Sequence, residues 1–162
     1  AVRVDGAEGV AGKAIAAVPE LMMRIKDGKI IMLRDVETSH TIALDDGTYC
    51  YCTIRHGTGI GEFIERGKED VEKAITSPSL DDEDPISLVF ISSLPWLSYT
   101  SLVQPVPLSP PDSNPRITWG RFRTEGDRTI IPVSILVNHA LVDGIHIARF
   151  YSELEKAIAD LR

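Results

Sequence analysis

A histidine placed just after an apolar run is the residue of this sequence best suited to chemistry. Residues 129–137 are almost entirely apolar, which is typical of a strand buried on both faces. His139 follows this run, and Asp143 comes four residues later, directly before Gly144. An unperturbed imidazole titrates near neutral pH, so His139 could accept a proton from a reacting hydroxyl. Asp143 has the position of a helix N-cap, and Gly144 would let the backbone turn.

The spacing His-x-x-x-Asp-Gly alone also fits an ordinary turn between a strand and a helix, in which His139 has no chemical role. The flanking residues decide between the two interpretations. The segment HALVDGIHIARF, residues 139–150, closely resembles the signature of the chloramphenicol acetyltransferase family. Three further segments match family positions in the right order: SSLPW at 92–96, which resembles a Ser-x-x-Pro-Trp motif, PRIT at 115–118 and EGDR at 125–128. The resemblance extends over nearly the whole chain.

The resemblance implies direct acetyl transfer from acetyl-CoA, the co-substrate, to a hydroxyl group, with no acyl-enzyme and no metal. His139 would be the general base, with its tautomer fixed by its own backbone carbonyl. Ser93 would donate its hydroxyl to the oxyanion of the tetrahedral intermediate, and Thr118 would hold a water near the same charge. Asp143 would be structural, paired with an arginine rather than acting as the acid of a Ser-His-Asp triad. Gly144 would be its steric partner in the turn.

The sequence departs from the family pattern at a few positions. Asn138 stands where the family usually has a histidine, and Ile145 stands where a phenylalanine or tyrosine is usual. Since the histidine that Asn138 replaces is not the base of the family, we expect the chemistry to survive that change, and at Ile145 we expect a difference in local packing. His146 is expected to be a packing residue. The resemblance also implies that the chain lacks an N-terminal segment of the family, including the arginine partner of Asp143.

Hydrophobic periodicity predicts an α+β fold in a single domain, residues 1–162. The resemblance implies that this fold is the two-layer sandwich of a mixed β-sheet with helices found in CoA-dependent acyltransferases. Helices are predicted at 8–18, 60–75 and 144–161. Strands are predicted at 21–25 and 29–33 around an Asp-Gly turn, at 41–44, 48–54 and 86–91, at 116–123 with alternating faces, and at 129–137. The Pro-rich residues 104–115 are predicted to be irregular.

The composition argues against several classes of binding partner. Lys and Arg number 17 against 24 Asp and Glu, and the net charge of −7 argues against nucleic-acid binding. No apolar run reaches the length of a membrane span and no charged-then-apolar secretory leader is present in the sequence, so we expect a cytoplasmic protein without membrane contact. Cys50 and Cys52 are too few for a metal cluster and are expected to be small core residues on one face of a strand.

The predicted function is therefore acetyl transfer to a small-molecule hydroxyl, with chloramphenicol or a related compound as the acceptor, which would make the chain an antibiotic-resistance enzyme. The resemblance further implies a homotrimer whose active sites lie at subunit interfaces. One alternative is the catalytic core of a dihydrolipoyl acyltransferase, although the usual Asp-His-Arg-x-x-Asp-Gly of that class is not matched by Asn138 and Ala140. Another is a trimeric assembly module without catalysis.

Overall fold

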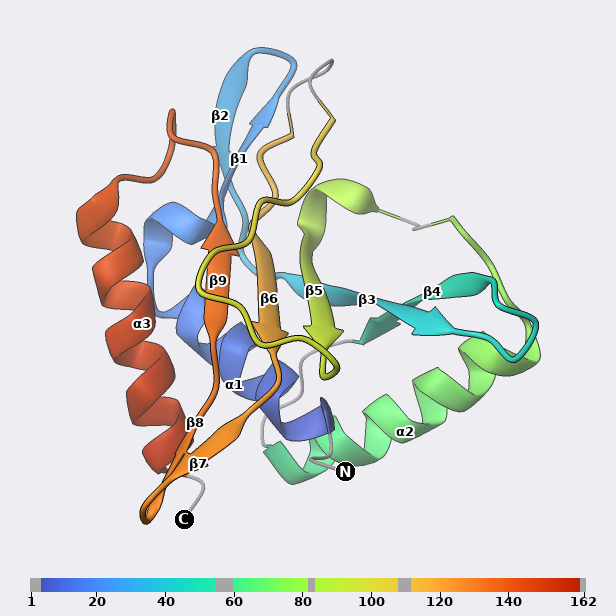
Figure 1. Ribbon diagram of the computed structural model, residues 1–162. Coiled ribbons are helices and arrows are strands. Elements are labelled where there is room, and N and C mark those ends of the chain that lie inside the picture. The colour runs from blue at the N-terminus through green and yellow to red at the C-terminus, as the bar shows by residue number, and fades with distance from the viewer. Residues whose placement is uncertain (1–3, 55–59, 82–83, 108–111, 161–162) are drawn as a thin grey trace.

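The structure is a computed structural model that describes residues 4–54, 60–81, 84–107 and 112–160 (Figure 1). Its helical elements are α1 (Val4–Ala16), α2 (Ile60–Thr76), α3 (Gly144–Ala159) and the short 3-10 helices η1 (Pro19–Met22) and η2 (Pro85–Ser87). Its strands are β1 (Met23–Lys26), β2 (Lys29–Met32), β3 (Glu37–Ala43), β4 (Tyr49–Ile54), β5 (Leu88–Leu94), β6 (Arg116–Gly120), β7 (Arg123–Glu125), β8 (Arg128–Ile130) and β9 (Val133–Leu136). No helix in the described ranges is long and apolar enough to cross a membrane.

A five-stranded mixed sheet in the order β4-β3-β5-β6-β9 organises the molecule. The pairs β3–β5 and β5–β6 are parallel, whereas β3–β4 and β6–β9 are antiparallel. Figure 1 shows α1 and α3 on one face of this sheet, and the coil that follows β5 crossing the other face in front of β6 and β9. The predicted α+β class with a mixed sheet is therefore confirmed.

The hairpin of β1 and β2 has the turn that its Asp-Gly pair predicts. Asp27 has a φ of 51° and Gly28 a φ of 70°. Positive φ at both central residues is the two-residue turn that matches the twist of paired strands, and Asp-Gly accommodates it at little cost. This confirmed prediction matters for the site, because the hairpin directly follows η1, which packs near the start of α3.

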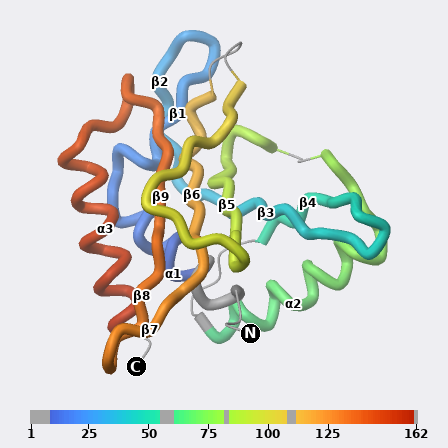
Figure 2. The backbone as a smooth tube through the Cα atoms, viewed as in Figure 1, coloured from blue at the N-terminus to red at the C-terminus, as the bar shows by residue number. Residues whose placement is uncertain are grey.

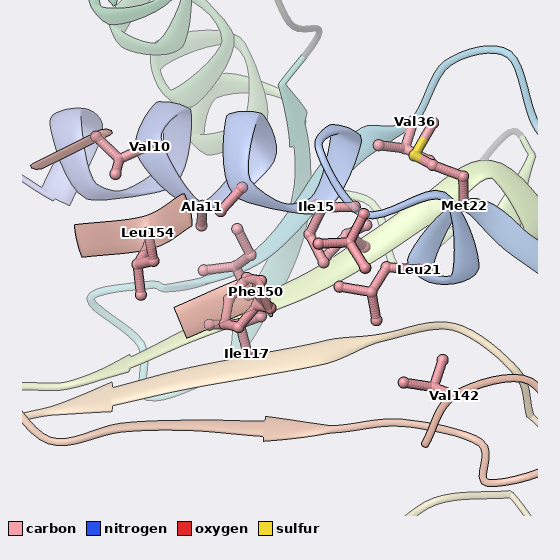
Figure 3. Close-up of a cluster of buried hydrophobic side chains, with 14 of the residues drawn as sticks. Val10, Ala11, Ile15, Leu21, Met22, Val36, Ile117, Val142, Phe150 and Leu154 are labelled. Atoms are coloured by element: carbon pink, nitrogen blue, oxygen red, sulfur yellow. The ribbon is translucent and has the colours of Figure 1, made fainter. Parts of the chain in front are cut away.

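The main core lies between the sheet and the helices α1 and α3 (Figure 3). Ile15 from α1 and Phe150 from α3 are fully buried there. Ile117 and Trp119 of β6 join the same core, as the predicted alternation of that strand requires. Cys50 and Cys52 of β4 are buried, as expected. Because residues of one strand alternate between faces, the side chain of Thr118, which lies between Ile117 and Trp119 in β6, faces away from these helices.

The last two predicted strands are each interrupted. The apolar run 129–137 was expected to be one strand buried on both faces, but it divides into β8 and β9 around Pro132, and β9 is a half-buried edge strand. Pro132 has no N–H for a ladder, and its carbonyl accepts a hydrogen bond from the Gly120 backbone N–H. The strand at 116–123 also ends early, at Gly120. A Cβ on Gly120 would lie 2.6 Å from the Leu97 carbonyl oxygen, so the coil after β5 crosses here.

Arg24 is a fully buried cation that fastens β1 to the start of β5. Its guanidinium donates to the backbone carbonyls of Ile86 (3.0 Å) and Leu88 (3.0 Å). It also donates to the carbonyls of Leu21 (2.9 Å) and Met23 (2.8 Å). Burial lowers the pKa of Arg24 to about 10, so the side chain still carries its charge at neutral pH. Four carbonyls would lose a donor if this side chain were removed.

We therefore expect Arg24→Met to lower the free energy of unfolding by about 3 kcal/mol or more, because buried carbonyls that lose a donor are costly, even though the Leu88 carbonyl keeps the Asn114 Nδ2 donor at 2.8 Å. Urea unfolding followed by circular dichroism measures this change. The matched control is Arg34→Met at an exposed arginine, which should stay within about 0.5 kcal/mol of the parent. Equal effects of the two changes would show that the carbonyl contacts of Arg24 contribute little.

Candidate active site

His139 lies in the turn between β9 and α3, and its side chain is exposed. Its Nδ1 lies 3.1 Å from the carbonyl oxygen of Val142. A carbonyl can only accept, so Nδ1 carries the proton and the lone pair is on Nε2. The imidazole is thus held in the tautomer that a base with Nε2 as its reactive atom requires. The expectation that the histidine's own carbonyl does this is wrong, since the turn places the carbonyl of Val142 there instead.

Asp143 is the N-cap of α3, as predicted. Its Oδ1 accepts a hydrogen bond from the Gly144 backbone N–H at 2.7 Å, and Asp143 forms a capping box with His146. Within the described residues, no arginine or lysine forms an ion pair with Asp143, so the arginine partner implied by the resemblance is not found there. His146 does more than pack, because its Nδ1 accepts the Asp143 N–H at 2.9 Å. At Gly144 an added Cβ would meet nothing within 4 Å, and the structure gives no reason for the glycine.

A pocket of about 280 Å³ opens beside His139. It is also lined by Val106, Pro107, Asp112 and Asn114 from the coil before β6, and by Leu136, Val137 and Asn138. Asn138 joins the two sides, since its Nδ2 donates to the Asp112 carbonyl (3.0 Å) and its Oδ1 accepts from the Ala140 N–H (3.0 Å). This departure from the family pattern therefore has a structural role in holding the turn of His139.

A second group of hydroxyls lies on the sheet face opposite to the helices. The register pairs Ser92 of β5 with Thr118 of β6, and Thr118 with Ser134 of β9, so the three side chains share one face. Thr118 is buried beneath the coil after β5. Gln104 donates from Nε2 to Thr118 Oγ1 at 2.6 Å, and Tyr99 donates from its hydroxyl to the Thr118 carbonyl at 2.7 Å. The Thr118 hydroxyl therefore keeps its own proton for another acceptor. Nothing in the sequence around Gln104 and Tyr99 indicated these contacts.

The structure does not bring Ser93 to this group. Ser93 pairs with Trp119, which belongs to the core face of the sheet, so its side chain is directed away from Thr118. The expectation that Ser93 and Thr118 share a site is therefore wrong, and the serine that does share the face of Thr118 is Ser92. The sequence held the signal for this, because Ser92, and not Ser93, stands three residues before Pro95, as the Ser-x-x-Pro-Trp spacing requires.

Within one chain, His139 and the hydroxyl group lie at opposite ends of the sheet. Ser134 is level with Thr118, and β9 leads from Ser134 away from this group to Leu136, before the turn that holds His139. The two strand residues after Ser134 alone carry the chain about 7 Å away. This separation exceeds the roughly 3 Å over which a base, a reacting group and a hydrogen-bond donor cooperate. Figure 2 shows the turn before α3 at the end of β9 farthest from β7 and β8.

No cluster of three or more His, Cys, Asp or Glu side chains suited to a metal ion occurs among the described residues.

The fold is that of acyltransferases. A chloramphenicol acetyltransferase structure superimposes with a TM-score of 0.75 at 19% identity, covering 92% of this chain and 74% of that one. A dihydrolipoamide acetyltransferase from Azotobacter vinelandii gives a TM-score of 0.74 at 20% identity, covering 95% and 68%. These values establish the shared fold.

Sequence similarity then gives the family. The family profile "Chloramphenicol acetyltransferase" matches residues 10–155. Chloramphenicol acetyltransferase 3 of Escherichia coli is 29% identical over 147 residues, covering 89% of this chain and 69% of the relative. The chloramphenicol acetyltransferase of a Klebsiella species is 27% identical over 152 residues, covering 91% and 68%. The chain belongs to the chloramphenicol acetyltransferase family, and it is an acyltransferase.

Proposed function

We propose that this protein transfers the acetyl group of acetyl-CoA to a hydroxyl of chloramphenicol or a related small molecule, with His139 as the general base. One observation carries the proposal: Nδ1 of an exposed histidine is bonded to the Val142 carbonyl, so that the basic Nε2 is free, beside a pocket. The names of the relatives support acetyl-CoA and chloramphenicol as substrates. Acetylation of the antibiotic would confer resistance to it.

The proposed reaction needs only a base and a stabilised oxyanion. Nε2 of His139 takes the proton of the acceptor hydroxyl while that oxygen attacks the thioester carbon. The carbonyl oxygen becomes negatively charged. Collapse of the tetrahedral intermediate breaks the C–S bond, and the proton on Nε2 passes to the departing sulfur of CoA. A single base thus serves both steps.

We assign Ser92 the role of oxyanion donor, in place of the Ser93 expected from the sequence. Ser92 is exposed and lies beside Thr118, whose hydroxyl can donate because its oxygen already accepts from Gln104. Together the two residues could supply a donor and a bound water to the developing charge. A serine, a histidine and an asparagine have been studied for their role in the catalytic mechanism of the Azotobacter vinelandii dihydrolipoamide acetyltransferase, which shares this fold.

We propose that the complete site forms between two copies of the chain in a homotrimer. In one copy β9 leads from Ser134 away from the hydroxyls before the chain reaches the turn of His139, so we infer that the two parts of the site meet around one acceptor only between copies. Several large apolar side chains near the hydroxyl end of the sheet are exposed in the single chain, Trp96 (69%), Leu97 (55%), Val103 (90%) and Phe122 (46%). Burial of such a surface against a second copy would stabilise the assembly.

The experiment that tests the proposed reaction follows thiol release from acetyl-CoA, with chloramphenicol or dihydrolipoamide as the acceptor and with acetyl-CoA alone as the control. We expect release that depends on chloramphenicol. Release that depends only on dihydrolipoamide would favour the dihydrolipoyl class, whose structures share the fold. If a folded trimer released no thiol with either acceptor, the proposal would be overturned and an assembly module without catalysis would be favoured.

A further inference from the structure

Two hydrogen bonds meet on the single peptide group that joins Val142 to Asp143. On one side, His139 Nδ1 lies 3.1 Å from the carbonyl oxygen of Val142. On the other side, the N–H of Asp143 donates to His146 Nδ1 at 2.9 Å. The carbonyl and the N–H belong to one rigid plane, so the orientation of each bond fixes that of the other.

The direction of both bonds follows from the peptide itself. Its oxygen can only accept, so His139 carries its proton on Nδ1, and its N–H can only donate, so His146 has a lone pair on Nδ1. The proton of neutral His146 is therefore on Nε2. That atom lies 3.5 Å from Glu20 Oε1 in η1, and the other carboxylate oxygen of Glu20 is buried without a hydrogen-bond partner among the described residues. The two histidines thus hold opposite tautomers.

We propose that His146 is a positioning residue for His139 and acts through the Val142–Asp143 peptide. By accepting the Asp143 N–H, His146 holds the plane whose oxygen keeps the proton of His139 on Nδ1. Hydrogen bonds in series also polarise one another, which strengthens the bond to the catalytic histidine. The inference rests on the proposed function of His139, and it gives His146 a role beyond packing.

The test compares two substitutions at His146. His146→Asn places an amide oxygen where Nδ1 stands and so keeps the acceptor, whereas His146→Leu keeps bulk and removes it. We expect His146→Leu to lower kcat about 10-fold to 100-fold with little change in KM, as for residues that orient metal-bound histidines. We expect His146→Asn to stay close to the parent. Urea unfolding of both variants accompanies the kinetics.

The tautomer of His139 is the readout that a purely structural role would not move. In ¹⁵N NMR of the histidine-labelled parent, His139 should carry its proton on Nδ1 and His146 on Nε2. His146→Leu should shift His139 toward the Nε2–H form, and His146→Asn should not. The same tautomer at both histidines of the parent would overturn the proposal whether or not any variant folds. The proposal would also be overturned if His146→Leu changed neither the tautomer of His139 nor kcat. An equal loss of kcat in His146→Asn and His146→Leu would overturn it as well.

The NMR readout needs no turnover, so it separates this inference from the proposed function. A parent with opposite tautomers and no acetyl transfer would contradict the proposed reaction and leave the link between the two histidines intact. A parent that transfers acetyl groups but has the same tautomer at both histidines would contradict the link between them and leave the proposed reaction intact.

Discussion

His139→Ala is expected to lower the rate of acetyl transfer by about 100-fold to 10,000-fold, the usual contribution of a general base, while acetyl-CoA still binds. The physical reason is that the other ionisable side chain among the described residues lining the pocket, Asp112, is ion-paired with Arg116, so the hydroxyl would have to lose its proton to water as it attacks. Steady-state kinetics give the rate, and equilibrium titration of the variant with acetyl-CoA gives the binding.

His139→Gln is the matched second variant. It restores a polar side chain of similar size, but an amide cannot take up a proton at neutral pH, so the variant should be as inactive as His139→Ala. Retention of more than about a tenth of the parent rate by either variant would exclude His139 as the base, given the size of the effect that a base supplies.

Ser92→Ala is expected to lower kcat about 100-fold to 1,000-fold and to change both Michaelis constants little, because an oxyanion donor acts mainly in the transition state. The prediction depends on the register that places Ser92 beside Thr118 on the face away from the helices. Initial rates measured over a range of acetyl-CoA and acceptor concentrations separate kcat from the two Michaelis constants.

Ser93→Ala is the control, one residue away in the same strand. Ser93 pairs with Trp119 of the core face, so its hydroxyl has no access to the proposed site and kcat should remain near that of the parent. The opposite result, with kcat lost in Ser93→Ala and retained in Ser92→Ala, would contradict the assignment and restore the interpretation drawn from the sequence alone.

The pair of adjacent serines shows how far sequence reasoning reached. Local patterns predicted the turn of His139, the N-cap at Asp143 and the Asp-Gly hairpin, because each depends on neighbours in the chain. The choice between Ser92 and Ser93 depends on which face of the sheet each one occupies, and a shift of one residue reverses the face. The choice is decided by the pairing of Ser92 with Thr118, a residue from a distant segment of the chain.

Other features depended on contacts that no local pattern contains. The acceptor for His139 Nδ1 is set by the backbone of a turn whose dihedral angles the residue types do not determine, so the carbonyl of Val142 replaced the one expected. Gln104 reaches Thr118 from a Pro-rich coil that has no periodicity to place it. The interruption at Pro132 was visible in the sequence, but the apolar run around it outweighed the proline in the prediction.

The central claim is that one active site combines His139 of one chain with Ser92 of another, and mixed assembly tests it most directly. His139→Ala and Ser92→Ala, each nearly inactive alone, are refolded together in equal amounts with different affinity tags, and mixed trimers are isolated by both tags. If each site takes its histidine and its serine from different chains, every mixed cyclic trimer has one intact site among its three and restores about a third of the parent activity. Mixed trimers no more active than either variant alone would contradict the claim.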